Sequence, residues 1–207
     1  MAEQETIDAM TSAAAKADDA ALVKILDGAP PGIVNRPNIY DRTAIQVMNS
    51  DSPSTARILI DHGADLDRPD PSVQRTILHD IAERGCIETL NLLLEHGANA
   101  TARDNMGNTP AHLAAEKGGS YRIQILDRLS QNCTLTEVNA AGKTPLDLAN
   151  EGNHREVVEW LQNFYTRVFP LQFLVRRVIT MRVRVINNLH NLLPSILIDY
   201  LHGRRPK

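Results

Sequence analysis

The sequence predicts an all-α protein built from stacked helix–turn–helix repeats, and three observations support this prediction. Apolar residues recur at the spacing of amphipathic helices. Only 4% of the residues are aromatic, which suits helical layers filled with Leu, Ile and Ala. A related phrase also returns at intervals of 33, 33 and 35 residues, beginning at Thr43, Thr76, Thr109 and Thr144.

The repeat that begins at Thr76 illustrates the pattern. Gly85 should end its first helix, because glycine adopts turn conformations without steric cost. The apolar face of that helix is formed by Leu78, Ile81 and Ala82. Gly97 should be the left-handed C-cap of the second helix, as Gly63 should be one repeat earlier. The apolar positions of the second helix are Ile87, Leu90, Leu93 and Leu94.

Thr109-Pro110-Ala111-His112 opens the third of these units, and with the 33-residue period it resembles the ankyrin repeat. The resemblance implies an all-α ankyrin-repeat solenoid over residues 6–165 whose default function is to bind another protein. A weaker first copy lies between Ile7 and Leu26. Polar Thr and His side chains should fix each turn into the first helix. The expected repeats cover residues 6–37, 42–74, 75–108, 109–142 and 143–165.

The second repeat departs from the others. A polar series, Asn49-Ser50-Asp51-Ser52-Pro53, interrupts it, so its first helix should be only about one turn long. Ser52 should be the N-cap of the next helix, with Pro53 at its first position. The following loop, from Ala64 to Thr76, is one residue longer than the loop from Ala98 to Thr109.

This irregular repeat is similar to one in the small ankyrin inhibitors of cyclin-D-dependent kinases. The similarity is carried by Asn38-Ile39-Tyr40-Asp41-Arg42-Thr43-Ala44-Ile45-Gln46-Val47-Met48, and then by Ile77-Leu78-His79-Asp80-Ile81-Ala82-Glu83-Arg84-Gly85. It continues into Ala102-Arg103-Asp104-Asn105. Two positions depart from the family: Glu83 replaces a basic residue, and Ala20 replaces an acidic one.

The resemblance implies a protein that inhibits cyclin-dependent kinases 4 and 6 by non-covalent binding beside the kinase cleft, blocking cyclin D-dependent activation and G1 progression. It implies that Asp80 pairs with a kinase arginine. Met48, Gln46 and Tyr40 would line the contact, with Asp70 and Glu88 as supporting acids. The alternatives are that Asp80 is a solvated helix residue and Met48 a core residue.

The last part of the chain differs from the rest. Residues 1–160 carry a net charge of −10, and residues 161–207 carry +7. We expect a basic helical tail over residues 166–207, which resembles a SOCS box. That resemblance implies elongin binding through Leu171, Val175 and Ile179, and cullin binding through Leu193, Pro194 and Tyr200. The chain would then be a ubiquitin-ligase substrate adaptor. A helical cap, or a basic segment that touches acidic lipid, is an alternative for the tail, and a plain scaffold is an alternative for the protein.

Other classes of function find little support. Gly142-Lys143-Thr144 ends like a phosphate-binding loop, but Glu137 stands where that motif needs glycine. The two cysteines, Cys86 and Cys133, lack the spacing of a metal or disulfide motif. We therefore expect no enzyme, cofactor or metal. An acidic repeat region should not bind nucleic acid. Without a signal peptide or an apolar run of membrane-spanning length, we expect a cytoplasmic and nuclear protein with no membrane span.

Overall fold

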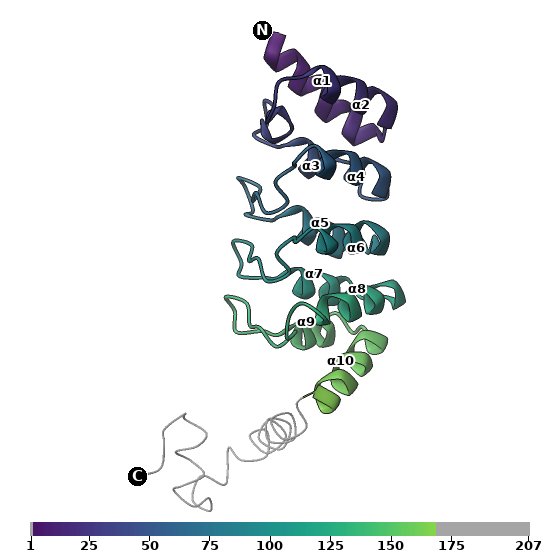
Figure 1. Ribbon diagram of the computed structural model, residues 1–207. Helices are drawn as coiled ribbons and strands as arrows, with labels where there is room; N and C mark the ends of the chain where they lie inside the picture. The colour runs from purple at the N-terminus through teal and green to yellow at the C-terminus, as the bar shows by residue number, and fades with distance from the viewer. Residues whose placement is uncertain (1, 169–207) are drawn as a thin grey trace, which may run out of the picture. The chain divides into compact units, whose positions relative to one another are not determined.

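The computed structural model describes residues 2–168, which are entirely helices and loops. The prediction of an all-α protein is therefore confirmed over these residues. The chain divides into two compact units, Met1–Trp160 and Leu161–Lys207. Figure 1 shows the paired helices of the first unit, with the connecting loops projecting on one side. The helices are α1 (Ala2–Lys16), α2 (Asp19–Gly28), α3 (Ala44–Val47), α4 (Pro53–Asp61), α5 (Ile77–Arg84), α6 (Ile87–Glu95), α7 (Pro110–Lys117), α8 (Ser120–Ser130), α9 (Pro145–Glu151) and α10 (Arg155–Val168), with a 3-10 turn at Ile33–Asn35.

The helices of the first unit form two layers. Helices α1, α3, α5, α7 and α9 form the inner layer, in which α5 packs on α7 and α7 on α9 (Figure 1). Helices α2, α4, α6 and α8 pack in the same order in the outer layer. No helical pair can bury both of its faces alone, so stability is spread along the stack. Large side chains between the layers are fully buried, among them Leu59, Leu78, Ile81, Leu90, Leu93, Leu113 and Leu126.

The recurring threonine and histidine form a capping box at the start of α5 and of α7. The backbone N–H of Thr76 donates to Nδ1 of His79 over 3.1 Å. Thr109 and His112 make the same bond. In the second repeat Gln46 replaces histidine, and its Oε1 accepts from the N–H of Thr43 at 2.9 Å. These bonds satisfy backbone donors that the helix itself leaves free. The predicted turn-fixing role is confirmed.

The other end of the same side chains links successive repeats. Nε2 of His79 donates to the backbone oxygen of Asn108 at 3.0 Å, and Nε2 of His112 to that of Lys143 at 3.0 Å. The amide of Gln46 reaches the oxygen of Arg68 in the same way at 2.9 Å. In the second, third and fourth repeats, one residue thus closes its own helix and ties down the next loop.

A second ladder joins α6, α8 and the residue before α10 to the ends of the preceding inner segments. Thr89 donates to the backbone oxygen of Ser50 at 2.7 Å. Arg122 donates to the oxygen of Glu83 at 2.8 Å, and His154 to that of Glu116 at 2.7 Å. The acceptors are 33 residues apart, and each bond satisfies a carbonyl that the end of a helix or turn leaves free.

The irregularity of the second repeat is also confirmed. Helix α3 has four residues, and Ser52 accepts a hydrogen bond from the N–H of Thr55 as the N-cap of α4, with Pro53 following it. The extra loop residue lies in the tip between Asp70 and Arg75, where the N–H of Asp70 donates to the oxygen of Arg75. The corresponding bond in the next tip joins Asp104 to Asn108, one residue closer in sequence.

Glycines end the helices as expected. Gly85 caps α5 with φ 85°, and Gly63 and Gly97 follow the ends of α4 and α6 with φ 81° and 86°.

The predicted boundaries between the repeats stay predictions. None of the helices described between residues 2 and 168 is long and apolar enough to cross a membrane. The six proposed SOCS-box residues lie outside the described residues: Leu171, Val175, Ile179, Leu193, Pro194 and Tyr200.

Candidate functional site

We call the surface formed by helices α3, α5, α7 and α9, together with the loop tips 38–42, 70–75, 104–108 and 139–143, the inner face. Asp80 lies on this face in the first turn of α5. Its side chain is 26% exposed, so it is partly desolvated but can still be reached from solvent. Its contact with Arg42, 3.6 Å between Nη2 and Oδ2, is an ion pair, and the described part of the chain offers it no hydrogen bond.

Burial is the main influence on Asp80, and it raises the pKa of this carboxyl above its usual range. The positive charges of Arg42 and Arg75 oppose this effect on the pKa, Arg42 more strongly. A carboxylate that has lost water without gaining hydrogen bonds is electrostatically incomplete. Asp80 is therefore suited to receive a cation from a partner.

Arg42 is held more firmly by other groups than by Asp80. Its Nε lies 3.1 Å from Oδ2 of Asp70, and its Nη2 donates to the backbone oxygen of Gln46 at 3.2 Å. Asp70 in turn is buried, and its Oδ1 accepts the N–H groups of Ser72 and Val73 at 2.8 and 3.2 Å. Asp70 thus shapes the tip 70–75 and anchors Arg42, rather than offering a free carboxylate.

Gln46 and Met48 are both buried, with 6% and 5% exposure. The amide of Gln46 is occupied by the capping box and by Arg68. Met48 follows α3 directly and packs in the core. Their predicted place in the contact stays a prediction.

Tyr40 lies at the exposed tip 38–42, with 74% of its surface accessible. Ile39 beside it is 70% exposed, and Met106 is 63% exposed at the tip 104–108. Sequence reasoning did not select Ile39 or Met106 as site residues. The sequence feature that could have identified them is a large apolar residue inside a polar turn. Backbone bonds join neighbouring tips, from the N–H of Asn105 to Val73 and from that of Ala140 to Met106.

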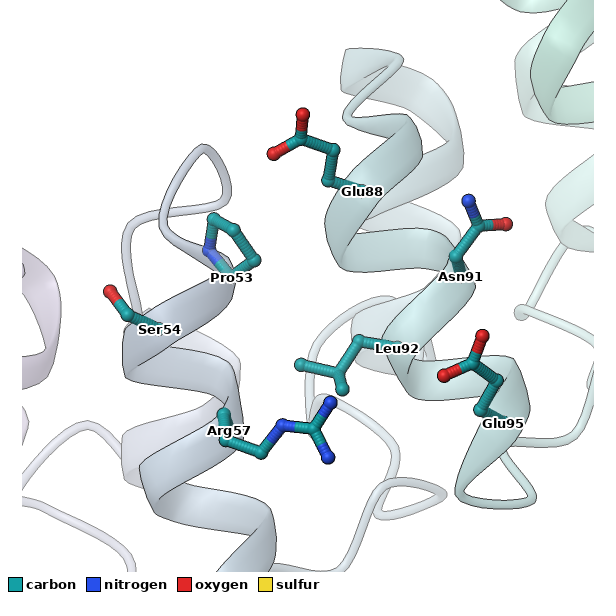
Figure 2. A pocket seen from close by; sticks show the side chains of 7 residues that line it. All are labelled: Pro53, Ser54, Arg57, Glu88, Asn91, Leu92 and Glu95. Atoms are coloured by element: carbon teal, nitrogen blue, oxygen red, sulfur yellow. The ribbon is translucent and has the colours of Figure 1, made fainter.

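Glu88 lies in the other layer. It is exposed near the start of α6, in a groove between α4 and α6 that Figure 2 shows from close by. The structure therefore does not bring Glu88 into the cluster around Arg42. The groove is lined by Pro53, Ser54, Arg57, Glu88, Asn91, Leu92 and Glu95.

A second charged cluster neighbours Asp80 on the inner face. Glu83, at the position where the resembled family carries a basic residue, is paired with Arg75 at 2.9 Å and with Lys117 at 3.2 Å. Arg75 also lies 3.6 Å from the buried carboxylate of Asp104. Glu83 is thus neutralised by two cations, whereas Asp80 is held only loosely. No group of three or more residues that could hold a metal ion occurs among residues 2–168.

The stacked helical pairs and the loop-tip face define an ankyrin-repeat protein. The family model of three ankyrin repeats matches residues 11–104. Over 118 residues the chain is 38% identical to cyclin-dependent kinase inhibitor 2A of Monodelphis domestica, covering 56% of this chain and 67% of the relative. It is 38% identical to human cyclin-dependent kinase 4 inhibitor B over 112 residues, which cover 54% of this chain and 79% of the relative. The chain belongs to this family of ankyrin-repeat cyclin-dependent kinase inhibitors.

Proposed function

We propose that this protein binds cyclin-dependent kinase 4 or 6 without covalent chemistry. By binding beside the kinase cleft, it blocks cyclin D-dependent activation and progression through G1. Membership of the family supports this proposal. The structural observation that carries it is Asp80, a half-buried carboxylate on the inner face that lacks a hydrogen bond within residues 2–168.

A kinase arginine would complete the surroundings of Asp80. A guanidinium presents several N–H donors in a plane, so it can bind a carboxylate through two bonds and replace the water lost on burial. Because Asp80 is desolvated before the partner arrives, part of the cost of forming the interfacial pair is already met during folding. The contact is therefore more favourable at Asp80 than at a fully exposed acid.

The remaining predicted residues have different parts in this proposal. Tyr40 and the neighbouring exposed apolar side chains would pack on the kinase surface. Gln46, Met48 and Asp70 would keep α3 and the tip 70–75 in shape. Glu88 would contribute long-range attraction to a basic partner from the outer layer. The proposal also places the protein in the cytoplasm and nucleus, which microscopy of the full chain carrying a fluorescent tag would test.

Calorimetric titration of purified kinases 4 and 6 with the full chain tests the proposal. We expect binding and a loss of cyclin D-dependent kinase activity. Asp80→Asn should weaken binding by about 1–3 kcal/mol, because a charge-assisted bond is replaced by a weaker neutral one. Asp127→Asn makes the same change at an exposed position of α8 and should leave affinity unchanged. Absence of binding at micromolar protein would refute the function.

A further inference from the structure

Arg42 is a cation of this chain that lies beside Asp80, where a cation from a partner would also have to bind. Its guanidinium contacts Asp70 through Nε and Asp80 through Nη2, at 3.1 and 3.6 Å. The two carboxylates come from the loop tip 70–75 and from helix α5, and Arg42 precedes α3. The three charges thus meet only because the second repeat stacks on the third.

The two contacts are unequal. Asp70 is buried, with a side-chain exposure of 10%, and Arg42 is its only cation within 4.0 Å among the described residues. Loss of that cation would leave a buried charge without an opposite charge, which is costly. The backbone oxygen of Gln46 adds a further hydrogen bond to the guanidinium. Arg42 is therefore held by Asp70 and α3 whether or not Asp80 has another partner.

We propose that Arg42 is a specificity-determining residue that competes with the partner's arginine for Asp80 and so lowers the affinity of the site for cations. This inference rests on the proposed function, because it concerns how Arg42 limits cation binding at Asp80. Together Asp70, Asp80 and Arg42 carry a net charge of −1. A cation approaching Asp80 is repelled by Arg42 at close range.

Repulsion of this kind lowers the affinity for every cation but increases the selectivity between partners. An isolated ammonium or a flexible basic peptide gains little from a carboxylate that already faces a guanidinium. A partner succeeds when its own rigid surface supplies further contacts to offset the repulsion. Arg75 and Arg84 also act electrostatically on Asp80, with Glu83 acting in the opposite direction. Among the described residues, only Arg42 is in direct ion-pair contact with Asp80.

The test replaces Arg42 by Gln, which removes the positive charge and keeps a polar side chain at this position. Kinase binding should tighten by about twofold to fivefold at low ionic strength, the scale of one partly exposed charge pair. The gain should shrink as salt is added, because the repulsion is screened. Arg68→Gln removes the same charge from a residue that pairs with exposed Asp41, and should change affinity far less.

A probe that does not involve the kinase separates this inference from the proposed function. N-acetyl-arginine amide is titrated into isotopically labelled full-length protein, and shifts of the backbone amides of α5 are followed by NMR. Binding should be stronger in Arg42→Gln than in wild type and absent in Asp80→Asn. If the kinase does not bind but the probe behaves as described, the function fails and the inference stands. If Arg42→Gln binds kinase and probe no better than wild type, the inference is wrong.

A double variant keeps the test decisive if Arg42→Gln unfolds. Asp70→Asn combined with Arg42→Gln removes the buried anchor pair as a unit, so that Asp70 is not left as a buried charge without its cation. Thermal denaturation would first confirm folding. The double variant should still bind the kinase and the arginine probe more tightly than wild type, since the charge repelling the cation is gone. Equal or weaker binding by a folded double variant would overturn the proposal.

Discussion

His79 donates from Nε2 to the backbone oxygen of Asn108, 29 residues further along the chain, at 3.0 Å. Its Nδ1 accepts the N–H of Thr76, so the ring must be neutral to make both bonds. Burial lowers the pKa of His79 below its ordinary value of 6.5, and it does the same for His112. Each of these two equivalent rings can thus accept its capping N–H only while it is uncharged.

The first prediction is a loss of stability in mild acid. Because the pKa of each histidine is lower in the folded than in the unfolded chain, the unfolded chain takes up protons first. The stabilisation is complete above the unfolded value of 6.5 and is lost as pH falls towards the folded pKa. Urea unfolding between about pH 7.5 and about pH 5.5 should show a decreasing free energy of unfolding.

His79→Gln with His112→Gln is the matched variant, since Gln46 makes the same two bonds in the second repeat. The double variant should stay folded, and the slope of stability against pH should become shallower. A slope as steep as that of wild type would show that other groups cause the acid sensitivity.

A second prediction concerns the bond between the second and third repeats. Thr89→Val retains the shape of the side chain but removes the hydroxyl that donates to Ser50. Both residues are buried, so the oxygen of Ser50 loses this partner, and the free energy of unfolding should fall by about 1–3 kcal/mol. Thr101→Val removes a hydroxyl from an exposed turn and should cost much less. Chemical denaturation of both variants measures the difference.

A third prediction concerns Gly107 in the tip 104–108. Its φ is 73°, and a Cβ there would lie 2.7 Å from the backbone nitrogen of Ala140 in the next tip. Gly107→Ala should therefore destabilise the protein by about 1–3 kcal/mol through backbone strain and the clash. Gly28→Ala, at the end of α2 where a Cβ meets nothing within 4 Å, is the control. Similar melting temperatures for the two variants would contradict the prediction.

The fourth prediction concerns the reactivity of Cys86. Its thiol donates to Oδ1 of Asp51 at 2.9 Å. Burial and the neighbouring carboxylate raise the pKa of Cys86 to about 12. Because the thiolate is the reactive form, alkylation by iodoacetamide at about pH 8 should be much slower than for a free thiol. Asp51→Asn should accelerate it, whereas alkylation of Cys133, whose pKa burial raises, should not change. Peptide mass spectrometry measures both rates.

The sequence by itself determined the helical class, the capping threonines, the turn glycines and the one-turn helix α3. These features are local: a cap, a turn or an apolar face depends on residues within about one or two helical turns. The interruption between Asn49 and Pro53 could therefore be located before any packing was known. The same local pattern predicted that Asp80 lies on a helix, but it could not show which charged residues surround its carboxylate.

Only the tertiary structure decided which of the proposed site residues are available to a partner. Gln46, Met48 and Asp70 are buried, Tyr40 is exposed, and Glu88 lies in the groove between α4 and α6. Arg42 meets Asp70 and Asp80 across 28 and 38 residues. Such pairings depend on how one repeat is rotated and displaced against the next, which is set by the packing of both helical layers together and by no local pattern.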